Sequence, residues 1–228
     1  MKDIKAHKKI VFLVLFIFGI KFNIAEGDSQ IVFKTHLGLR NYKVGKYKKA
    51  YEYFFDSAKK GNKEAQYYLG CMLLKGEGIE KNFIRAFKWL SIAAEQGHLK
   101  ALNVIGVIYK NGTETHKNLD EARKFFQLSA DKNLNVGQFN LGVLLFERYK
   151  AKRKNASHEL ETKEHDGHGK VENYREDLVE GYKWLKISEL NGFERAAKVL
   201  KILQSEILPS EIVDIENQAE VFSKKFKN

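Results

Sequence analysis

The chain has 228 residues, of which 30% are charged, and a formal net charge of +11 at pH 7. Its single cysteine, Cys71, excludes an intramolecular disulfide. The basic balance favours anionic partners such as nucleic acid, phospholipid or acidic cell-wall polymers. However, the lysines are scattered and no aromatic–basic nucleic-acid motif is present, so lysine-rich solvated helix faces are the simpler interpretation. No specific nucleic-acid partner is predicted.

Residues 1–27 have the organisation of a secretory signal peptide. Four lysines precede an unbroken apolar run from Ile10 to Ile20, and the small residues Ala25 and Gly27 follow it. The run is shorter than the about 20 apolar residues that a membrane-spanning helix needs. The sequence therefore predicts a secreted or periplasmic protein. The alternatives are an uncleaved N-terminal membrane anchor and, in a eukaryote, the lumen of the endoplasmic reticulum.

A repeat with a period of 36 residues dominates the rest of the chain. One series of small and apolar residues recurs as Gly61, Ala65, Leu69 and Gly70; Gly97, Ala101, Ile105 and Gly106; and Asn133, Gly137, Leu141 and Gly142. A second series, in step with it, recurs as Ala50, Tyr53 and Ala58; Ala86, Trp89 and Ala94; and Ala122, Phe125 and Ala130. Such a period marks stacked helix pairs rather than a closed catalytic core, so the predicted fold class is all-α.

The repeat divides the chain into units, each of two helices. The first unit, residues 28–60, is incomplete, and two full units follow at 61–96 and 97–132. A third unit, 133–191, contains an insertion, and capping helices occupy residues 192–228. In the first full unit the helices lie around 62–75 and 83–96. The predicted N-caps of the second helices are Asn82, Asn118 and Asp177. Their predicted stops are Gly61, Gly97, Asn133 and Gly192.

A glycine recurs inside the first helix of each unit, at Gly70, Gly106 and Gly142. Each costs about 1 kcal/mol relative to alanine, which implies that another helix approaches closely. We expect the bulky Trp89, and its equivalents in the other units, to lie on this flat surface and to be buried between neighbouring helix pairs.

The third unit contains an insertion. Trp184 stands 59 residues after Phe125 rather than 36, so 23 extra residues lie at about 150–172. This segment is polar and charge-mixed and has no apolar face, which predicts a flexible loop that folding does not require.

The full units resemble the Sel-1-like repeat, a relative of the tetratricopeptide repeat with a longer turn between its helices. Residues 61–97, from GNKEAQYYLG to WLSIAAEQG, are similar to one copy and 97–133 to a second. A third copy is split by the insertion, and the N-terminal unit is more similar to a tetratricopeptide repeat. The resemblance implies a right-handed α-solenoid that serves as an adaptor or assembly scaffold. Bacterial relatives of this kind are often exported and act in the envelope or in host interaction.

The resemblance also implies a binding groove. In tetratricopeptide-type superhelices the first helix of each pair lines the concave side. Carried over position by position, the groove residues are Tyr67, Asn103 and Phe139, with Glu64, Lys100 and Val136 one turn earlier. Aromatic rings supply contact area and the asparagine supplies directional hydrogen bonds. Ordinary surface variation is the alternative for each of these positions.

Two patterns suggest chemistry, and neither is predicted to act. His158, His165 and His168 could chelate a metal loosely, but a flexible loop lacks the outer contacts that orient ligands, so no metal site or cofactor is predicted. Ser57-x-x-Lys60 and Ser129-x-x-Lys132 match the spacing of penicillin-recognising enzymes. Because Ala93 occupies the equivalent position in the intervening unit, we interpret these serines as structural residues at the end of a repeated helix.

Cys71 falls at a repeat position that Val107 and Val143 fill elsewhere, which predicts a small core hydrophobe. A cysteine-rich branch of the repeat family is linked with β-lactamase activity, and this chain departs from it. Asn111 and Asn155 begin glycosylation sequons that matter only in a eukaryote.

The sequence thus predicts an exported, non-catalytic scaffold that binds a protein or peptide in its groove. The first alternative is an envelope hydrolase acting on β-lactams or peptidoglycan. The second is a basic surface that binds an anionic polymer.

Overall fold

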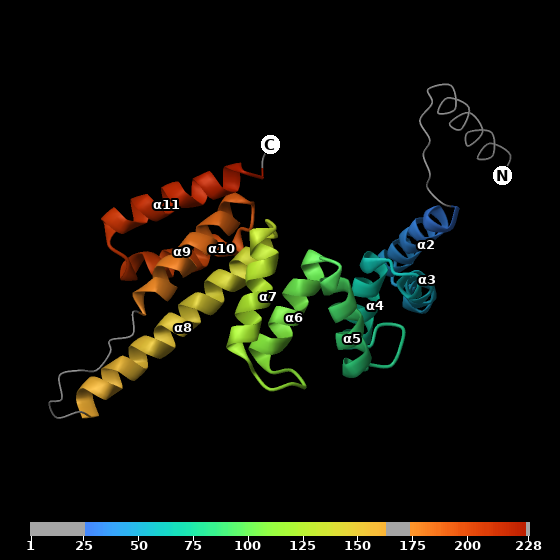
Figure 1. Cartoon of the computed structure of the whole chain (residues 1–228), viewed down its shortest axis with the longest axis horizontal. Coiled ribbons are helices and arrows are strands. Elements are labelled where there is room, and N and C mark those ends of the chain that lie inside the picture. The colour runs from blue at the N-terminus through green and yellow to red at the C-terminus, as the bar shows by residue number, and fades with distance from the viewer. Residues whose placement is uncertain (1–25, 163–173, 227–228) are drawn as a thin grey trace, which may run out of the picture.

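The computed structural model describes residues 26–162 and 174–226, and all regular elements in these two ranges are helical. In chain order they are α2 (Glu26–Lys43), α3 (Tyr47–Lys59), α4 (Lys63–Lys75), α5 (Phe83–Glu95), α6 (Leu99–Asn111), α7 (Leu119–Asp131), α8 (Asn135–Thr162), α9 (Arg175–Leu190), α10 (Arg195–Leu203), the short 3₁₀ helix η1 (Gln204–Glu206) and α11 (Pro209–Lys224). Consecutive helices form the pairs α2–α3, α4–α5, α6–α7 and α8–α9, which stack into an elongated array (Figure 1). The predicted all-α solenoid is confirmed.

The helix boundaries follow the repeated caps. The side chain of Asn82 accepts a hydrogen bond from the N–H of Arg85 at 2.9 Å, and Asn118 accepts from the N–H groups of Asp120 and Glu121. The residues that end the second helices have positive φ angles: 90° at Gly61, 73° at Gly97, 64° at Asn133 and 84° at Gly192. Glycine and asparagine are the residues that adopt this conformation at least cost, which confirms the predicted stops.

The prediction that Asp177 caps a helix is wrong. Helix α9 begins two residues earlier, and Asp177 lies in its first turn, buried against α8. There its Oδ2 atom lies 3.6 Å from Nε of Arg148 and 3.4 Å from Nζ of Lys152. The carboxylate thus faces two cations of the neighbouring helix, and α9 begins after Tyr174 without a side-chain cap.

The residues that face the repeated glycines lie one position after those expected. A Cβ atom at Gly70 would stand 2.6 Å from Cγ of Leu90, and one at Gly106 would stand 2.6 Å from the ring of Phe126. The same relation joins Gly38 to Phe54 and Gly142 to Leu185. Trp89 is only half-buried, so the expectation that it fills this position is wrong. The reason is geometric: on a helix, adjacent residues point about 100° apart, so the second helix turns its next residue to the glycine.

The insertion is helical for much of its length. Helix α8 continues to Thr162, so the expected loop does not begin at about residue 150; residues 163–172 lie outside the described ranges. The sequence from Val143 to Asp166 contains neither glycine nor proline, so nothing in it ends the helix. In addition, Lys152 reaches Asp177, and Arg153 pairs with Glu206.

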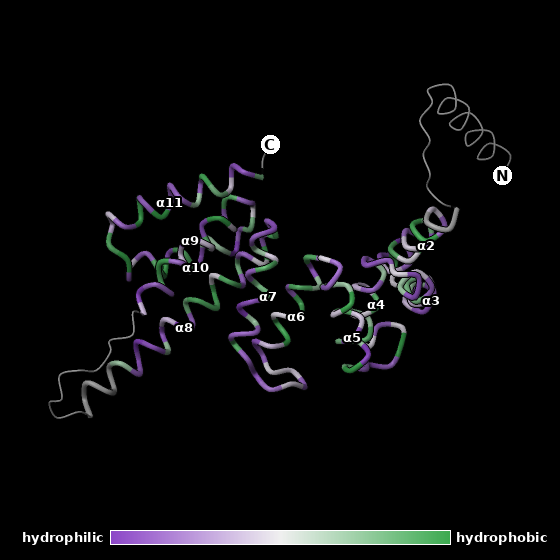
Figure 2. Tube along the Cα trace, in the orientation of Figure 1, coloured by the Kyte–Doolittle hydropathy of each residue, from purple (hydrophilic) through white to green (hydrophobic). Residues whose placement is uncertain are grey.

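The core forms a series of clusters along the array. Ala50, Phe54 and Leu69 belong to the N-terminal cluster, whereas Tyr182, Leu185 and Ile215 belong to the C-terminal one. Apolar and polar stretches alternate along the helices, as in helices that bury one stripe (Figure 2). At the C-terminal end α9 contacts both α10 and α11, so the last helices fold back over it.

Candidate functional site

The predicted groove residues lie on the first helices of three units, at the seams where each first helix meets the next. Tyr67 on α4, Asn103 on α6 and Phe139 on α8 occupy equivalent positions, and all three are half-buried. Each contacts a residue that lies in, or just before, the following first helix. The three residues therefore line three successive seams along the array and do not form one common site.

At the first seam, Tyr67 and Glu64 meet His98, the residue that precedes α6. The rings of Tyr67 and His98 stack with 4.5 Å between centroids, and Nε2 of His98 lies 2.9 Å from Oε2 of Glu64. Nδ1 of His98 accepts a hydrogen bond from the N–H of Ala101 at 3.1 Å, so the proton of the neutral ring lies on Nε2, which donates to Glu64. His98 is thus the N-cap of α6.

Both rings at this seam are held in their neutral forms. Burial raises the pKa of Tyr67 well above its ordinary value of 10, and the nearby Cys71 adds to this effect. Burial also lowers the pKa of His98 below its ordinary value of 6.5, although Glu64 pulls it the other way. At neutral pH this seam therefore offers an uncharged aromatic pair with one carboxylate beside it.

The second and third seams have different chemistry. The side-chain amide of Asn140 donates to Oδ1 of Asn103 at 2.8 Å. The ring of Phe139 lies 4.9 Å from that of Phe193, in the turn before α10. Lys100, one turn before Asn103, is exposed. The seams therefore offer an aromatic–carboxylate, an amide and an apolar surface in succession, with a lysine between the first two.

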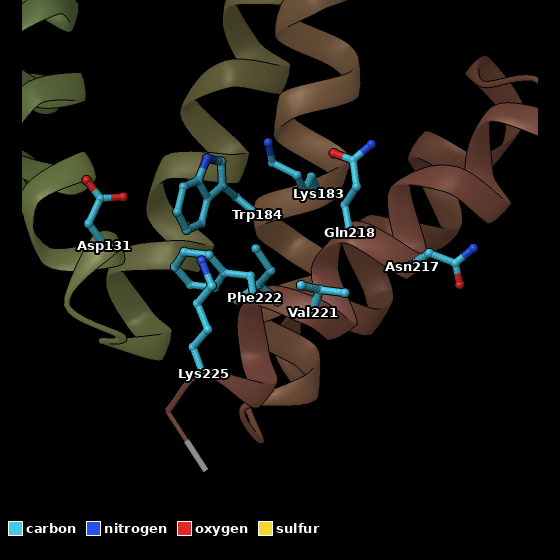
Figure 3. Close-up of a pocket in the computed structure, with 9 residues that line it drawn as sticks. Asp131, Lys183, Trp184, Asn217, Gln218, Val221, Phe222 and Lys225 are labelled. Atoms are coloured by element: carbon cyan, nitrogen blue, oxygen red, sulfur yellow. The ribbon is translucent and has the colours of Figure 1, made fainter. Parts of the chain in front are cut away.

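A pocket that the sequence analysis missed lies at the other end of the array, among α7, α9 and α11 (Figure 3). Its volume is about 490 Å³. The rings of Trp184 and Phe222 make its floor and meet edge to face with 5.3 Å between centroids. Lys183 and Lys225 lie above and below the aromatic pair in this view, and Asp131 lies to its left (Figure 3). This arrangement suits an apolar or aromatic group that carries a charge at its edge.

The repeat pattern could not predict this pocket because α11 is not a copy of a repeat helix. The stripe Ile212, Ile215, Ala219 and Phe222 does mark α11 as amphipathic. It does not say that α11 lies across α9 and reaches the end of α7. The pocket follows from that placement.

The residues that suggested chemistry have structural contacts. The buried hydroxyl of Ser57 donates to the carbonyl oxygen of Ile31 at 3.3 Å, and that of Ser129 donates to the carbonyl oxygen of Phe126 at 2.9 Å. Cys71 is half-buried, and burial raises the pKa of its thiol to about 11. At neutral pH the thiol is therefore protonated, which disfavours nucleophilic attack.

The described residues contain no group of three or more His, Cys, Asp and Glu side chains placed to hold a metal ion. His158 falls within α8, whereas His165 and His168 lie outside the described ranges. Among the helices in residues 26–162 and 174–226, none is both long enough and apolar enough to cross a membrane.

Comparisons with known proteins agree with the geometry. Residues 63–98 and 99–134 each match the Sel1 repeat, so the chain contains two such repeats, offset by two residues from the predicted units. The chain is 29% identical to the Sel1 repeat protein from Oxalobacter formigenes, with a TM-score of 0.56 over 74% of this chain and 60% of that one. It is 20% identical to a protective antigen with an SLR fold from uropathogenic Escherichia coli, with a TM-score of 0.49 over 86% and 52% of the two chains. No curated protein matches the sequence.

Proposed function

We propose that this protein, with two Sel1 repeats inside a longer solenoid, is a non-catalytic scaffold that binds a peptide or protein along α4, α6 and α8. The observation that carries the proposal is the contrast between constant and variable positions of the repeat. Gly70, Gly106 and Gly142 keep the same role in each pair, whereas Tyr67, Asn103 and Phe139 present different chemistry at one equivalent place. Solenoids use such extended faces to bind other chains.

The seams favour an extended segment over a small molecule. Three successive surfaces, separated by one repeat each, fit a partner that runs along the array and meets them in turn. Lys100 provides a charged contact between the first two seams, so we propose that the partner carries an acidic residue there.

A capture experiment with two lysine variants tests this proposal. Lys100→Glu reverses a charge on the binding face, and Lys88→Glu makes the same change on α5, in the second helix of its pair. Both side chains are exposed. Each protein serves as bait in an extract of the source organism, and captured partners are then titrated against purified bait. We expect a partner that binds wild type and Lys88→Glu alike and Lys100→Glu at least tenfold more weakly. Equal loss in both variants, or loss only in Lys88→Glu, contradicts the proposed face.

We also propose that residues 1–27 direct export, and that the scaffold acts in the envelope or toward a host. The support is the basic start and the apolar run of Ile10–Ile20 in the sequence. Residues 1–27 fused to a leaderless alkaline phosphatase should give active enzyme outside the cytoplasm. Replacing Leu13 and Leu15 by arginine should abolish that activity. Activity that is unchanged in the variant contradicts export by this segment.

A further inference from the structure

The net charge of the chain is concentrated near its N-terminal helix pair. Residues 28–63 carry nine basic and three acidic side chains, whereas residues 64–228 carry 26 basic and 24 acidic ones. Residues 28–59, in α2, α3 and the turn between them, carry seven basic and three acidic side chains, which is half of the excess of eight positive charges beyond the first 27 residues. This turn forms a basic tip, defined here as Arg40, Lys43, Lys46, Lys48 and Lys49 together with Val44.

The charges of the basic tip have no partner within the described ranges. All five cationic side chains are exposed, and no carboxylate of the described residues lies within ion-pair distance of any of them. Elsewhere cations are commonly paired, as Lys110 is with Glu147 and Arg175 with Glu211. No acidic residue occurs between Arg40 and Tyr51, so the tip is a patch of one sign.

The fold does not require these lysines. Lys46 precedes α3 and gives it no side-chain cap, and the first turn of α3 contains Lys48 and Lys49 but no acidic residue. Cations are unfavourable at this end of a helix, where the backbone dipole is positive. The equivalent helix α7 has the opposite arrangement, with Asn118 as its cap and two acids in its first turn. Helix stability therefore does not explain Lys46, Lys48 and Lys49, whereas Arg40 and Lys43 lie in the last turn of α2, where the backbone dipole favours cations.

The tip also has a fixed shape and an exposed apolar residue. Gly45 has a φ of 73°, the N–H of Lys46 donates to the carbonyl oxygen of Asn41 at 2.9 Å, and the N–H of Gly45 donates to that of Tyr42 at 3.1 Å. These two bonds close α2 in a Schellman motif. Val44, between the cations, is 63% exposed. The backbone thus holds an apolar side chain in the middle of a cationic surface.

The aromatic residues beside the tip, unlike Val44, contact other side chains of the protein. The rings of Tyr42 and Tyr47 meet with 5.4 Å between centroids, and the hydroxyl of Tyr42 donates to Glu77 at 2.6 Å. Proteins that bind single-stranded nucleic acid stack bases on free aromatic rings, and the tip offers none. A membrane surface, in contrast, accepts lysines at its anionic headgroups and a small apolar side chain at the headgroup–acyl boundary.

We propose that the basic tip docks the protein on an anionic lipid bilayer. The lysines and Arg40 contact headgroup phosphates and carboxylates, and Val44 enters the interface between them. Docking through the tip leaves the seams along α4, α6 and α8 free, so this binding is separate from the scaffold function proposed above.

Vesicle sedimentation with the full chain tests the proposal. A tip variant replaces Lys43, Lys46, Lys48 and Lys49 with glutamine. A control variant makes the same change at four exposed lysines elsewhere: Lys88, Lys132, Lys198 and Lys201. Vesicles of phosphatidylcholine with 30% phosphatidylserine or phosphatidylglycerol are compared with pure phosphatidylcholine. Because residues 1–27 are the same in all three proteins, differences in the lipid concentration for half-binding report the substituted lysines.

We expect the tip variant to need at least tenfold more anionic lipid for half-binding and the control variant less than twofold more. The wild type should bind pure phosphatidylcholine far more weakly than the anionic vesicles, and added salt should weaken its binding to them. Val44→Ser, which changes no charge, should raise the half-binding concentration at least threefold. Circular dichroism checks the fold, and the tip variant should be about as stable as wild type, because it removes unfavourable cations from the start of α3 and one favourable cation, Lys43, from the end of α2.

Four results overturn the proposal. Equal weakening in the tip and control variants would mean that net charge alone binds the vesicles, and no weakening in the tip variant would mean that the tip does not. Unchanged binding of Val44→Ser would remove the bilayer interface from the contact. A duplex DNA titration covers the other anionic surface: a tip variant that loses DNA binding but keeps vesicle binding would assign the tip to nucleic acid.

Discussion

At the scale of single residues, an absent side chain sets the distance between the helices of each pair. Gly38, Gly70, Gly106 and Gly142 each leave room for one large apolar residue of the second helix. That residue differs between pairs, since it is phenylalanine at position 126 and leucine at position 90. The glycine is therefore the same in every pair, whereas the apolar residue that it faces varies between pairs.

Replacing one of these glycines should destabilise the protein. In Gly106→Ala the new Cβ would stand 2.6 Å from the Phe126 ring, so ring and helix must shift. Overpacking of this kind costs about 1–3 kcal/mol, which outweighs the gain of about 1 kcal/mol in helix propensity. Urea denaturation measures the change. The control is Gly97→Asn, since asparagine adopts a φ of 64° at the equivalent position 133. A stabilised Gly106→Ala protein would show that the helices separate freely.

Two adjacent phenylalanines should differ sharply in their contribution to stability. Phe126 is fully buried, whereas Phe125 is only half-buried. Phe126→Ala should therefore cost about 3–5 kcal/mol through lost burial and a cavity, and Phe125→Ala clearly less. Denaturation curves of the two variants, which share one helix and one chemistry, give the comparison. If Phe125→Ala proves the more costly, the register of α7 against α6 described above is incorrect.

The sequence predicted the position of the helices better than the direction of their side chains. The period of 36 residues located each pair, and capping residues such as Asn82 located the boundaries. The choice between Trp89 and Leu90 as the residue facing Gly70 depends on a rotation of one helix about its axis, which the spacing of a repeat does not specify. For the same reason the sequence predicted the place of Tyr67 on the first helix of its pair but did not predict its stacking on His98.

At the scale of elements, α6 differs from α4 in its cap. Asn62 precedes α4 and His98 precedes α6, and both side chains accept a hydrogen bond from the N–H of an alanine three residues later. Protonation of His98 at Nδ1 removes that acceptor. The N-cap hydrogen bond of α6 therefore depends on pH, whereas that of α4 does not.

Acid should destabilise the protein partly through His98. Its pKa is lowered below 6.5 in the folded protein, so below about pH 6.5 the unfolded chain binds the proton more strongly. Stability is then full above this pH and falls as the pH drops through the lower pKa of the folded state. The variant His98→Asn gives α6 the same kind of cap that Asn62 gives α4, and asparagine does not titrate. The drop in melting temperature between pH 7 and pH 5 should be smaller in this variant; an equal drop in both proteins would show that His98 is not coupled to folding.

The extended end of α8 makes a second prediction at this scale. Deleting residues 157–171 retains Lys152 and Arg153, which pair with Asp177 and Glu206, whereas deleting 152–171 removes both. The first deletion should leave the melting temperature nearly unchanged. The second should lower it by a few degrees, because such partly exposed pairs contribute about 1 kcal/mol or less each and Asp177 is buried. Equal melting temperatures would show that the insertion does not contribute to stability.

At the scale of the whole molecule, α11 closes the C-terminal end of the array. Trp184 is only 6% exposed, and its ring meets that of Phe222 on α11. Ala219 of the same helix is fully buried in the cluster that contains Trp184. The end of the solenoid is thus covered by a helix that the repeat does not encode.

A chain that ends at Ile207 should expose this surface. In a Trp89→Phe background Trp184 is the only tryptophan. Its emission should shift to longer wavelength when α11 is removed, because water reaches the ring. The matched control is the same truncation in a Trp184→Phe background, where the emission of Trp89 should not change. A shift in Trp89 would mean that the truncation unfolds the array as a whole rather than uncovering its end.

The contacts between helices have a consequence for how the chain acquires its structure. The main contacts in the described ranges join helices that are adjacent or next but one along the sequence. Each pair can therefore form as soon as its own residues are available, without waiting for a distant segment. A chain that emerges N-terminus first from a ribosome or a membrane channel can then fold progressively behind the point of emergence. Only the closure of α9 must wait until α10 and α11 have also emerged.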